Sequence, residues 1–149
     1  MRKYLGWMAM AAMLTFLPGL TQAQATRFDV FGGAILGSPT GFLGGGDLVF
    51  PINRNFSFVP SAAVGRSGHT GLFTLDGTFR YAFHPDDQAF VPYVLGGVGM
   101  AQWGSATHGS AIIGVGARFP VGHGVWIVPE VRAASHGLAR FTIGFSKSF

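Results

Sequence analysis

The chain has 149 residues, no cysteine, 24 glycines and 15 phenylalanines, with only 10 basic and 6 acidic side chains. This length fits one domain with or without a targeting segment, and the missing cysteines exclude a disulfide scaffold, a zinc finger and a thiol nucleophile. A charged fraction of 11% is far below the roughly 25% of a soluble domain, and it also argues against a disordered segment or a nucleic-acid-binding domain.

The N-terminus has the features of an export signal. Two basic residues precede an apolar run from Leu5 to Leu20, which is shorter than the roughly 20 residues that a spanning helix needs. Ala23 and Ala25 then supply the small residues that signal peptidase requires. An uncleaved N-terminal anchor is the alternative. The predicted organisation is a cleaved signal peptide, residues 1–25, and one domain, residues 26–149.

Beyond this signal the side chains alternate with a period of two, which is typical of β-strands. In one segment Phe73 and Phe79 share one face, whereas Asp76 and Arg80 share the other. Clusters of Gly, Pro, Asn, Asp and Ser separate eight such segments, and short turns between them favour antiparallel, up-and-down connections. The predicted strands are Arg27–Leu36, Gly41–Phe50, Phe56–Arg66, Gly71–Phe83, Ala89–Gln102, Ala111–Phe119, Val125–Ala134 and Ala139–Phe149.

The two faces of these strands differ in chemistry. One face carries Phe, Val, Leu and Ile, and the other carries small polar residues and nine charged residues. An eight-stranded barrel is only wide enough inside for side chains, and buried ions must be paired. We therefore expect ion pairs in a filled lumen and lipid against the apolar face. The predicted lumen residues are Arg27, Asp29, Asp47, Asp76, Arg80, Arg118, Glu130, Arg132 and Arg140.

Two soluble folds are the alternatives, a lipocalin-like cup and a β-sandwich with an apolar core. Both need many charged side chains on the outside, but the predicted domain has one lysine, Lys147, and one glutamate, Glu130. A ring of aromatic residues at the end with both termini also favours a bilayer interface. The predicted ring consists of Phe28, Phe50, Phe56, Phe83, Phe90, Phe119, Trp126 and Phe149.

Two patches resemble the small bacterial outer-membrane β-barrel family, which includes OmpX and the barrel domain of OmpA. Residues 90–99 look like the family's strand with Pro, Tyr and spaced glycines after a periplasmic turn. The C-terminus looks like the family's assembly signal, with Thr142, Gly144 and the terminal aromatic Phe149. Lys147 departs from the pattern, because a bulky apolar residue is usual there. The likeness covers the signal peptide and essentially the whole domain.

This resemblance implies an all-β, eight-stranded antiparallel transmembrane barrel in the bacterial outer membrane, with both termini periplasmic. It implies contact with outer-membrane lipid and lipopolysaccharide, and recognition by periplasmic chaperones and the outer-membrane assembly machinery, with Phe149 as the residue read. Nucleic acid is not expected as a partner. No cofactor is expected.

Histidines are the candidate metal ligands. His69, His108 and His136 fall in three predicted outer loops, where three imidazoles are able to converge on an ion such as zinc. No acidic co-ligand accompanies them in these loops. We therefore expect solvated loop histidines and no metal site.

A lipid A-modifying, deacylase-like enzyme is the main functional alternative, because some barrels of this size deacylate lipid A. Ser135, His136 and Glu130 supply the side-chain types for nucleophilic hydrolysis. However, neighbours on a strand face opposite ways, and the chain has no Gly-x-Ser-x-Gly or phosphate-loop motif. We predict a structural or surface-interaction role without catalysis; a narrow channel is the second alternative.

Overall fold

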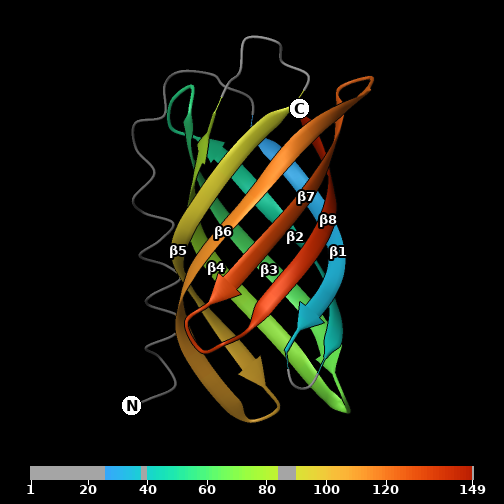
Figure 1. Ribbon diagram of the computed structural model, residues 1–149, viewed down its shortest axis with the longest axis vertical. Coiled ribbons are helices and arrows are strands. Elements are labelled where there is room, and N and C mark those ends of the chain that lie inside the picture. Colours follow the sequence, from blue (N-terminus) through green and yellow to red (C-terminus); the bar gives the residue numbers. More distant parts are fainter. Residues whose placement is uncertain (1–25, 38–39, 84–89, 149) are drawn as a thin grey trace.

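The computed structural model describes residues 26–37, 40–83 and 90–148, which form one closed sheet (Figure 1). Each strand pairs antiparallel with the next, and β8 pairs with β1. The predicted eight-stranded, up-and-down, all-β fold is therefore confirmed. The strands are β1 (Arg27–Leu36), β2 (Gly41–Pro51), β3 (Phe56–Ser67), β4 (Thr70–Ala82), β5 (Val91–Trp103), β6 (Ala106–Gly122), β7 (Val125–Ala134) and β8 (Ala139–Ser148).

The barrel has two distinct ends. We call the end where β1 begins and β8 finishes the terminal end; it also carries the β2–β3 and β6–β7 turns. The opposite end carries the β3–β4, β5–β6 and β7–β8 turns, and the β5–β6 hairpin lies at the bottom of Figure 1. The predicted signal peptide, with Ala23 and Ala25, and the terminal Phe149 lie outside the described residues.

The β5–β6 connection differs from the prediction. Residues 103–110 were expected to form a loop because they are rich in Gly and Ser, but only Gly104 and Ser105 make the turn. Trp103 pairs with Ala106 across it, and Gly104 takes the left-handed backbone conformation with φ of 56°. Hydrogen bonding to β5 stabilises this segment as a strand although its residues have weak strand propensity. His108 therefore lies within β6 and not in a loop.

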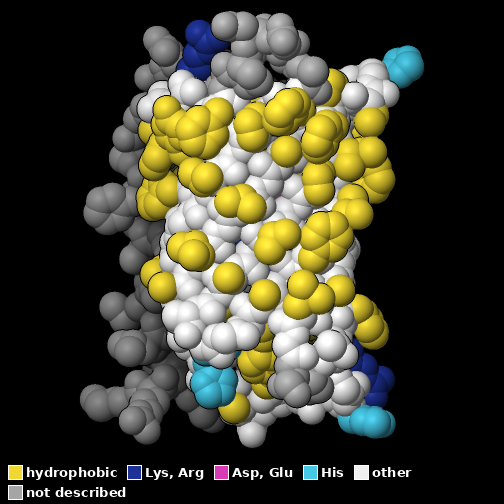
Figure 2. Space-filling view, viewed as in Figure 1, with side chains coloured by type: hydrophobic (Ala, Val, Ile, Leu, Met, Phe, Trp, Pro, Cys, Tyr) yellow, Lys and Arg dark blue, Asp and Glu magenta, His cyan; other side chains and the backbone are white. Residues whose placement is uncertain are grey.

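The outer wall of the barrel is apolar. Large hydrophobic side chains on it reach exposures of 65% at Val98 and 69% at Ile113. Figure 2 shows hydrophobic side chains spread over the visible wall, whereas basic and histidine side chains appear only near its two ends. The alternation of exposed and buried residues along each strand produces this separation. Among the described residues, no helix is long and apolar enough to cross a membrane.

Aromatic side chains gather on the wall near the terminal end. Phe56 stacks on Phe79 with ring centroids 5.7 Å apart, and Phe90 stacks on Phe119 at 5.8 Å. The prediction for Trp126 was wrong. Its side chain lies on the inward face of β7 with Val128 and Glu130, because the alternation of side chains along the strand, and not its position near the rim, decides where it points. There it packs beside a lumen cluster that consists of Tyr93, Leu95, Ile112 and Val128.

An apolar cluster fills the lumen toward the opposite end. Trp103 and Leu138 pack against it from the rim. These residues have the same strand parity as the buried charged residues, so they point inward with them. The sequence alternation already contained this signal in β1, where Phe31 and Ile35 share the face of Asp29. The cluster consists of Phe31, Ile35, Leu43, Ala63, Leu72 and Ala101.

Candidate functional site

The centre of the lumen holds a network of buried ions. Four carboxylates meet three guanidinium groups there, and each of these residues is at most 6% exposed. They come from five strands, and alternation turns each side chain inward. The carboxylates are Asp29 of β1, Asp47 of β2, Asp76 of β4 and Glu130 of β7; the guanidinium groups are Arg80 of β4, Arg132 of β7 and Arg140 of β8.

Arg132 joins three of the four carboxylates. Its Nη2 donates to Asp47 Oδ2 at 3.0 Å, and its Nη1 donates to Asp76 Oδ2 at 3.3 Å. Its Nε donates to Glu130 Oε1. The planar, five-donor fork of arginine suits several carboxylates at once, which a lysine at this position would not do.

Arg80 makes a second set of contacts. Its Nη2 donates to Glu130 Oε2 at 3.2 Å and lies 3.7 Å from Asp47 Oδ2, and its Nη1 lies 3.6 Å from Asp29 Oδ2. The Tyr93 hydroxyl also donates to Glu130 Oε2, at 2.7 Å. The ring of Tyr93 lies 4.2 Å from Arg80 Cζ, which is cation–π geometry. Glu130 thus accepts from two arginines and one tyrosine.

Sequence reasoning missed Tyr93 as a member of this network. The strand β5 contains no charged residue, and apart from Gln102 near its end both of its faces consist of apolar or aromatic residues and glycines. Alternation alone therefore gave no sign of which face points inward. Only the register of β5 against the charged strand β4 identifies Tyr93 as a lumen residue.

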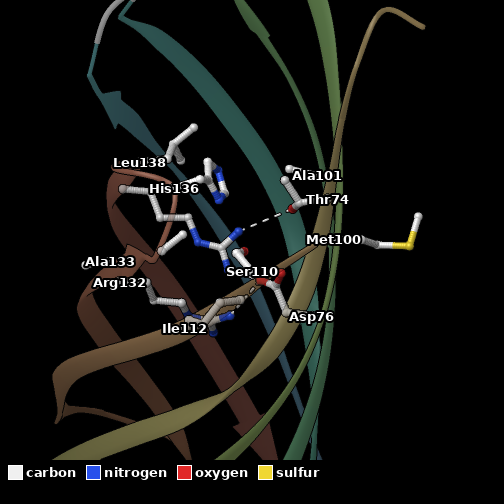
Figure 3. A pocket seen from close by; sticks show the side chains of 12 residues that line it. Thr74, Asp76, Met100, Ala101, Ser110, Ile112, Arg132, Ala133, His136 and Leu138 are labelled. Carbon is white, nitrogen blue, oxygen red and sulfur yellow. Dashed lines mark hydrogen bonds and ion pairs between the residues drawn. The ribbon is translucent and has the colours of Figure 1, made fainter. Parts of the chain in front are cut away.

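Arg140 connects the network toward the opposite end. It donates to Asp76 Oδ2 and, at 3.2 Å, to Thr74 Oγ1. A small pocket of about 30 Å³ lies beside it. Figure 3 shows this pocket, with His136 and Leu138 on one side of Thr74 and Asp76. The space holds no more than a few water molecules, so the pocket does not open the lumen.

Arg27 and Arg118 were predicted to take part in the lumen ion pairs, but they do not join the ionic network. Both lie at the terminal end, and in the described part of the chain neither is within 4.0 Å of a carboxylate oxygen. Arg118 instead lies over the ring of Trp126, with its Cζ 5.2 Å from the ring centroid. The four carboxylates are already engaged by Arg80, Arg132 and Arg140, which lie deeper in the lumen.

The chain matches no protein-family model and no curated protein. Among solved structures it resembles the N-terminal β-barrel domain of Pseudomonas aeruginosa OprF, with a TM-score of 0.65, 17% identity, and coverage of 84% of this chain and 97% of that one. It also resembles Neisserial surface protein A, with a TM-score of 0.65, 15% identity, and coverage of 83% of this chain and 96% of that one. A third similar structure is the outer-membrane enzyme PagL, with a TM-score of 0.56, 16% identity, and coverage of 83% of this chain and 99% of that one. The chain has the fold of the small eight-stranded outer-membrane β-barrels.

Within this transmembrane barrel, the described part of the C-terminal motif lies in the last strand. Thr142 is 5% exposed and faces the lumen, and Gly144 shares its face. A Cβ at Gly144 would lie 3.1 Å from the Val30 carbonyl oxygen, so β8 approaches β1 closely at this point. Close contact at the closing seam of the barrel is thus one reason for a glycine there.

The three candidate histidines of this outer-membrane barrel fold lie at the opposite end. The rings of His108 and His136 are 6.4 Å apart, and Trp103 meets His136 edge-on at 6.0 Å. His69 lies in the β3–β4 turn. No group of three or more His, Cys, Asp or Glu residues able to hold a metal ion occurs in residues 26–37, 40–83 and 90–148.

The serine considered for hydrolysis has a different hydrogen-bonding role. Ser135 Oγ accepts from the Ala111 amide at 3.2 Å, and the Ser135 amide donates to the Ala111 carbonyl at 2.9 Å. These bonds join the end of β7 to β6. Glu130, the candidate acid, is buried in its contacts with Arg80, Arg132 and Tyr93, so it is not available to orient a histidine base.

Proposed function

We propose that this protein is a structural barrel of the bacterial outer membrane, closed to solutes and without catalytic activity. The filled lumen carries this proposal. Buried ions occupy its centre, and the apolar cluster that includes Phe31, Leu43 and Leu72 occupies the opposite end. An eight-stranded barrel has no room for a channel beside such side chains. A narrow channel is therefore the weaker alternative.

The proposed orientation has both termini in the periplasm and the opposite end at the cell surface. The apolar wall would contact lipid and lipopolysaccharide, while periplasmic chaperones and the assembly machinery would recognise the strand that contains Thr142, Gly144 and Phe149. Two of the proposed surface turns are very short, Gly68–His69 and Gly104–Ser105. Among the described turns, a surface-interaction role would therefore use these turn tips, the β7–β8 turn and the rim.

Cell fractionation tests the proposed location. The protein is expected in the outer-membrane fraction, soluble only with detergent. Because the barrel closes on itself, an unheated sample should run on a gel as a compact, protease-resistant band that changes mobility after boiling. A protein that remains monodisperse without detergent would contradict the proposal. A change in lipid A mass that is lost in Ser135→Ala would contradict the absence of catalysis.

A second prediction concerns the lipid-facing wall. Replacing Ile113, 69% exposed in the middle of β6, with arginine should lower the free energy of unfolding in lipid vesicles by at least about 2 kcal/mol, because a charge would face hydrocarbon. Denaturant titration of folded protein in vesicles measures this value. Ser105→Arg, at the exposed β5–β6 turn, is the matched control and should change it by less than about 0.5 kcal/mol. Equal values for the two variants would argue for a water-facing wall.

A further inference from the structure

A cavity in the lumen lies at the terminal end. It has a volume of about 160 Å³, compared with about 30 Å³ for the pocket beside Arg140. That is room for several water molecules or for one small polyatomic ion. Four arginines from different elements line it together with Asn53 and Ser57: Arg27 of β1, Arg54 of the β2–β3 turn, Arg80 of β4 and Arg118 of β6.

The charge around this cavity is unbalanced. No aspartate or glutamate is among its described lining residues. Arg80 is shared among Asp29, Asp47 and Glu130 of the ionic network. Within the described chain, Arg27, Arg54 and Arg118 have no carboxylate within ion-pair distance. The cavity is therefore lined by three positive charges that form no ion pair with a described carboxylate.

Several of these guanidinium groups also lack hydrogen-bond acceptors. The buried nitrogens Arg27 Nε, Arg80 Nε and Arg118 Nη1 have no partner among the described residues, and Arg118 is only 6% exposed. A buried charged donor without an acceptor is costly, and the cost disappears when an anion supplies oxygens. These nitrogens belong to three strands, so a single ligand in the cavity is able to serve all three.

We propose that this cavity binds a phosphoryl oxyanion, either free inorganic phosphate or the phosphate of a lipid headgroup, through Arg27, Arg54 and Arg118. A phosphoryl group carries close to two negative charges and three strong acceptor oxygens. Arginine forks match this geometry and form charge-assisted hydrogen bonds to it. This site goes beyond the proposed structural role and does not depend on it, because the pocket lies inside the barrel and is testable in detergent.

Trp126 provides an internal reporter for this site. Its ring lies beneath the Arg118 guanidinium, which an anion would draw away or neutralise. The chain contains three tryptophans, so Trp7→Phe and Trp103→Phe together leave Trp126 as the only source of tryptophan emission. Titrating this variant of the full chain with inorganic phosphate, in an uncharged detergent and at constant ionic strength, should give a saturable emission change that chloride does not reproduce.

Arginine variants test the residues. Arg118→Gln and, separately, Arg54→Gln should each weaken phosphate binding by at least about tenfold. Arg54 is exposed in a turn, so its replacement leaves the fold intact. Arg66→Gln, an exposed arginine on the wall near the opposite end, should bind phosphate like the parent. At the same concentration, phosphate should also raise the denaturation midpoint of the parent more than that of Arg118→Gln, because a ligand that binds the native state more strongly stabilises it more.

Vesicles distinguish the two sources of the phosphoryl group. If a headgroup is the ligand, phosphatidic acid in phosphatidylcholine vesicles should change Trp126 emission without free phosphate; if the free ion is the ligand, only inorganic phosphate should. No saturable response to either probe, or equal weakening in Arg66→Gln, would overturn the proposal. Asp86 and Asp87 lie in the sequence between β4 and β5. A response to phosphate that appears only in the variant with Asp86→Asn and Asp87→Asn would also overturn the proposal, since carboxylates of the chain itself would then neutralise the arginines in the parent.

Discussion

Replacing Arg132 with methionine is expected to lower the free energy of unfolding by about 3–5 kcal/mol, because it leaves buried carboxylates without their counter-charge. Arg132 is 3% exposed and contacts Asp47, Asp76 and Glu130. Asp76 keeps Arg140, and Glu130 keeps Arg80 and Tyr93. Of its ion pairs with described residues, Asp47 keeps only the 3.7 Å contact with Arg80, so it should account for most of the loss.

Denaturant titration in detergent micelles or vesicles, followed by the mobility of the folded band, measures this loss. Arg66→Met is the matched control, because Arg66 is exposed on the wall, and it should change the value by less than about 0.5 kcal/mol. The double variant Arg132→Met with Asp47→Asn should cost less than the sum of the two single changes, because both act in one network. A single Arg132→Met variant as stable as the Arg66→Met control would show that the network contributes no net stability.

Replacing Gly97 with alanine is expected to cost about 3 kcal/mol or more, because the new methyl group would collide with backbone. Gly97 pairs with Thr78 on the neighbouring strand. A Cβ at Gly97 would overlap the Gly77 carbonyl oxygen and lie 2.7 Å from Thr78 Cα. A flexible side chain could turn aside, but these atoms belong to the sheet itself and move only if β4 and β5 separate.

The neighbouring glycine provides the control for this prediction. A Cβ at Gly96 would point outward, 3.8 Å from the Ile112 carbonyl oxygen as its nearest neighbour. Gly96→Ala should therefore leave stability unchanged or raise it by up to about 1 kcal/mol, since alanine restricts the unfolded chain. Refolding yield into micelles and the unfolding midpoint measure both variants. Equal behaviour at positions 96 and 97 would contradict the close approach of β4 and β5.

Much of the fold was predictable because alternation is a local property. In β4, most residues of one parity are polar or charged, such as Asp76 and Arg80, and most residues of the other are aromatic or aliphatic, such as Phe73 and Phe79. The wall and lumen faces follow from this contrast in the other strands with inward charges, but not in β3, whose one charged residue, Arg66, lies on the wall. In β5, which contains none, the same method gave no indication of the lumen face, and Tyr93 was missed.

The rim was less predictable, because turn-forming residues also occur inside strands. Residues 106–110 contain Gly and Ser but pair with β5, and Pro120 lies within β6 beside an irregularity in its register with β7. Trp126 was assigned to the outer aromatic ring from its position near the rim. Its parity with Glu130 was the better guide, and it places the ring beside Arg118.

By itself, the sequence of this protein determined the number of strands, their up-and-down order and the face that holds the ions, since these depend on neighbours within one strand or turn. Only the tertiary structure decided which ions meet. Arg132 and Asp47 are 85 positions apart, and Arg80 and Glu130 are 50 apart. Their contacts depend on strand register and barrel closure, and the same geometry leaves Arg27 and Arg118 beside a cavity instead of beside a carboxylate.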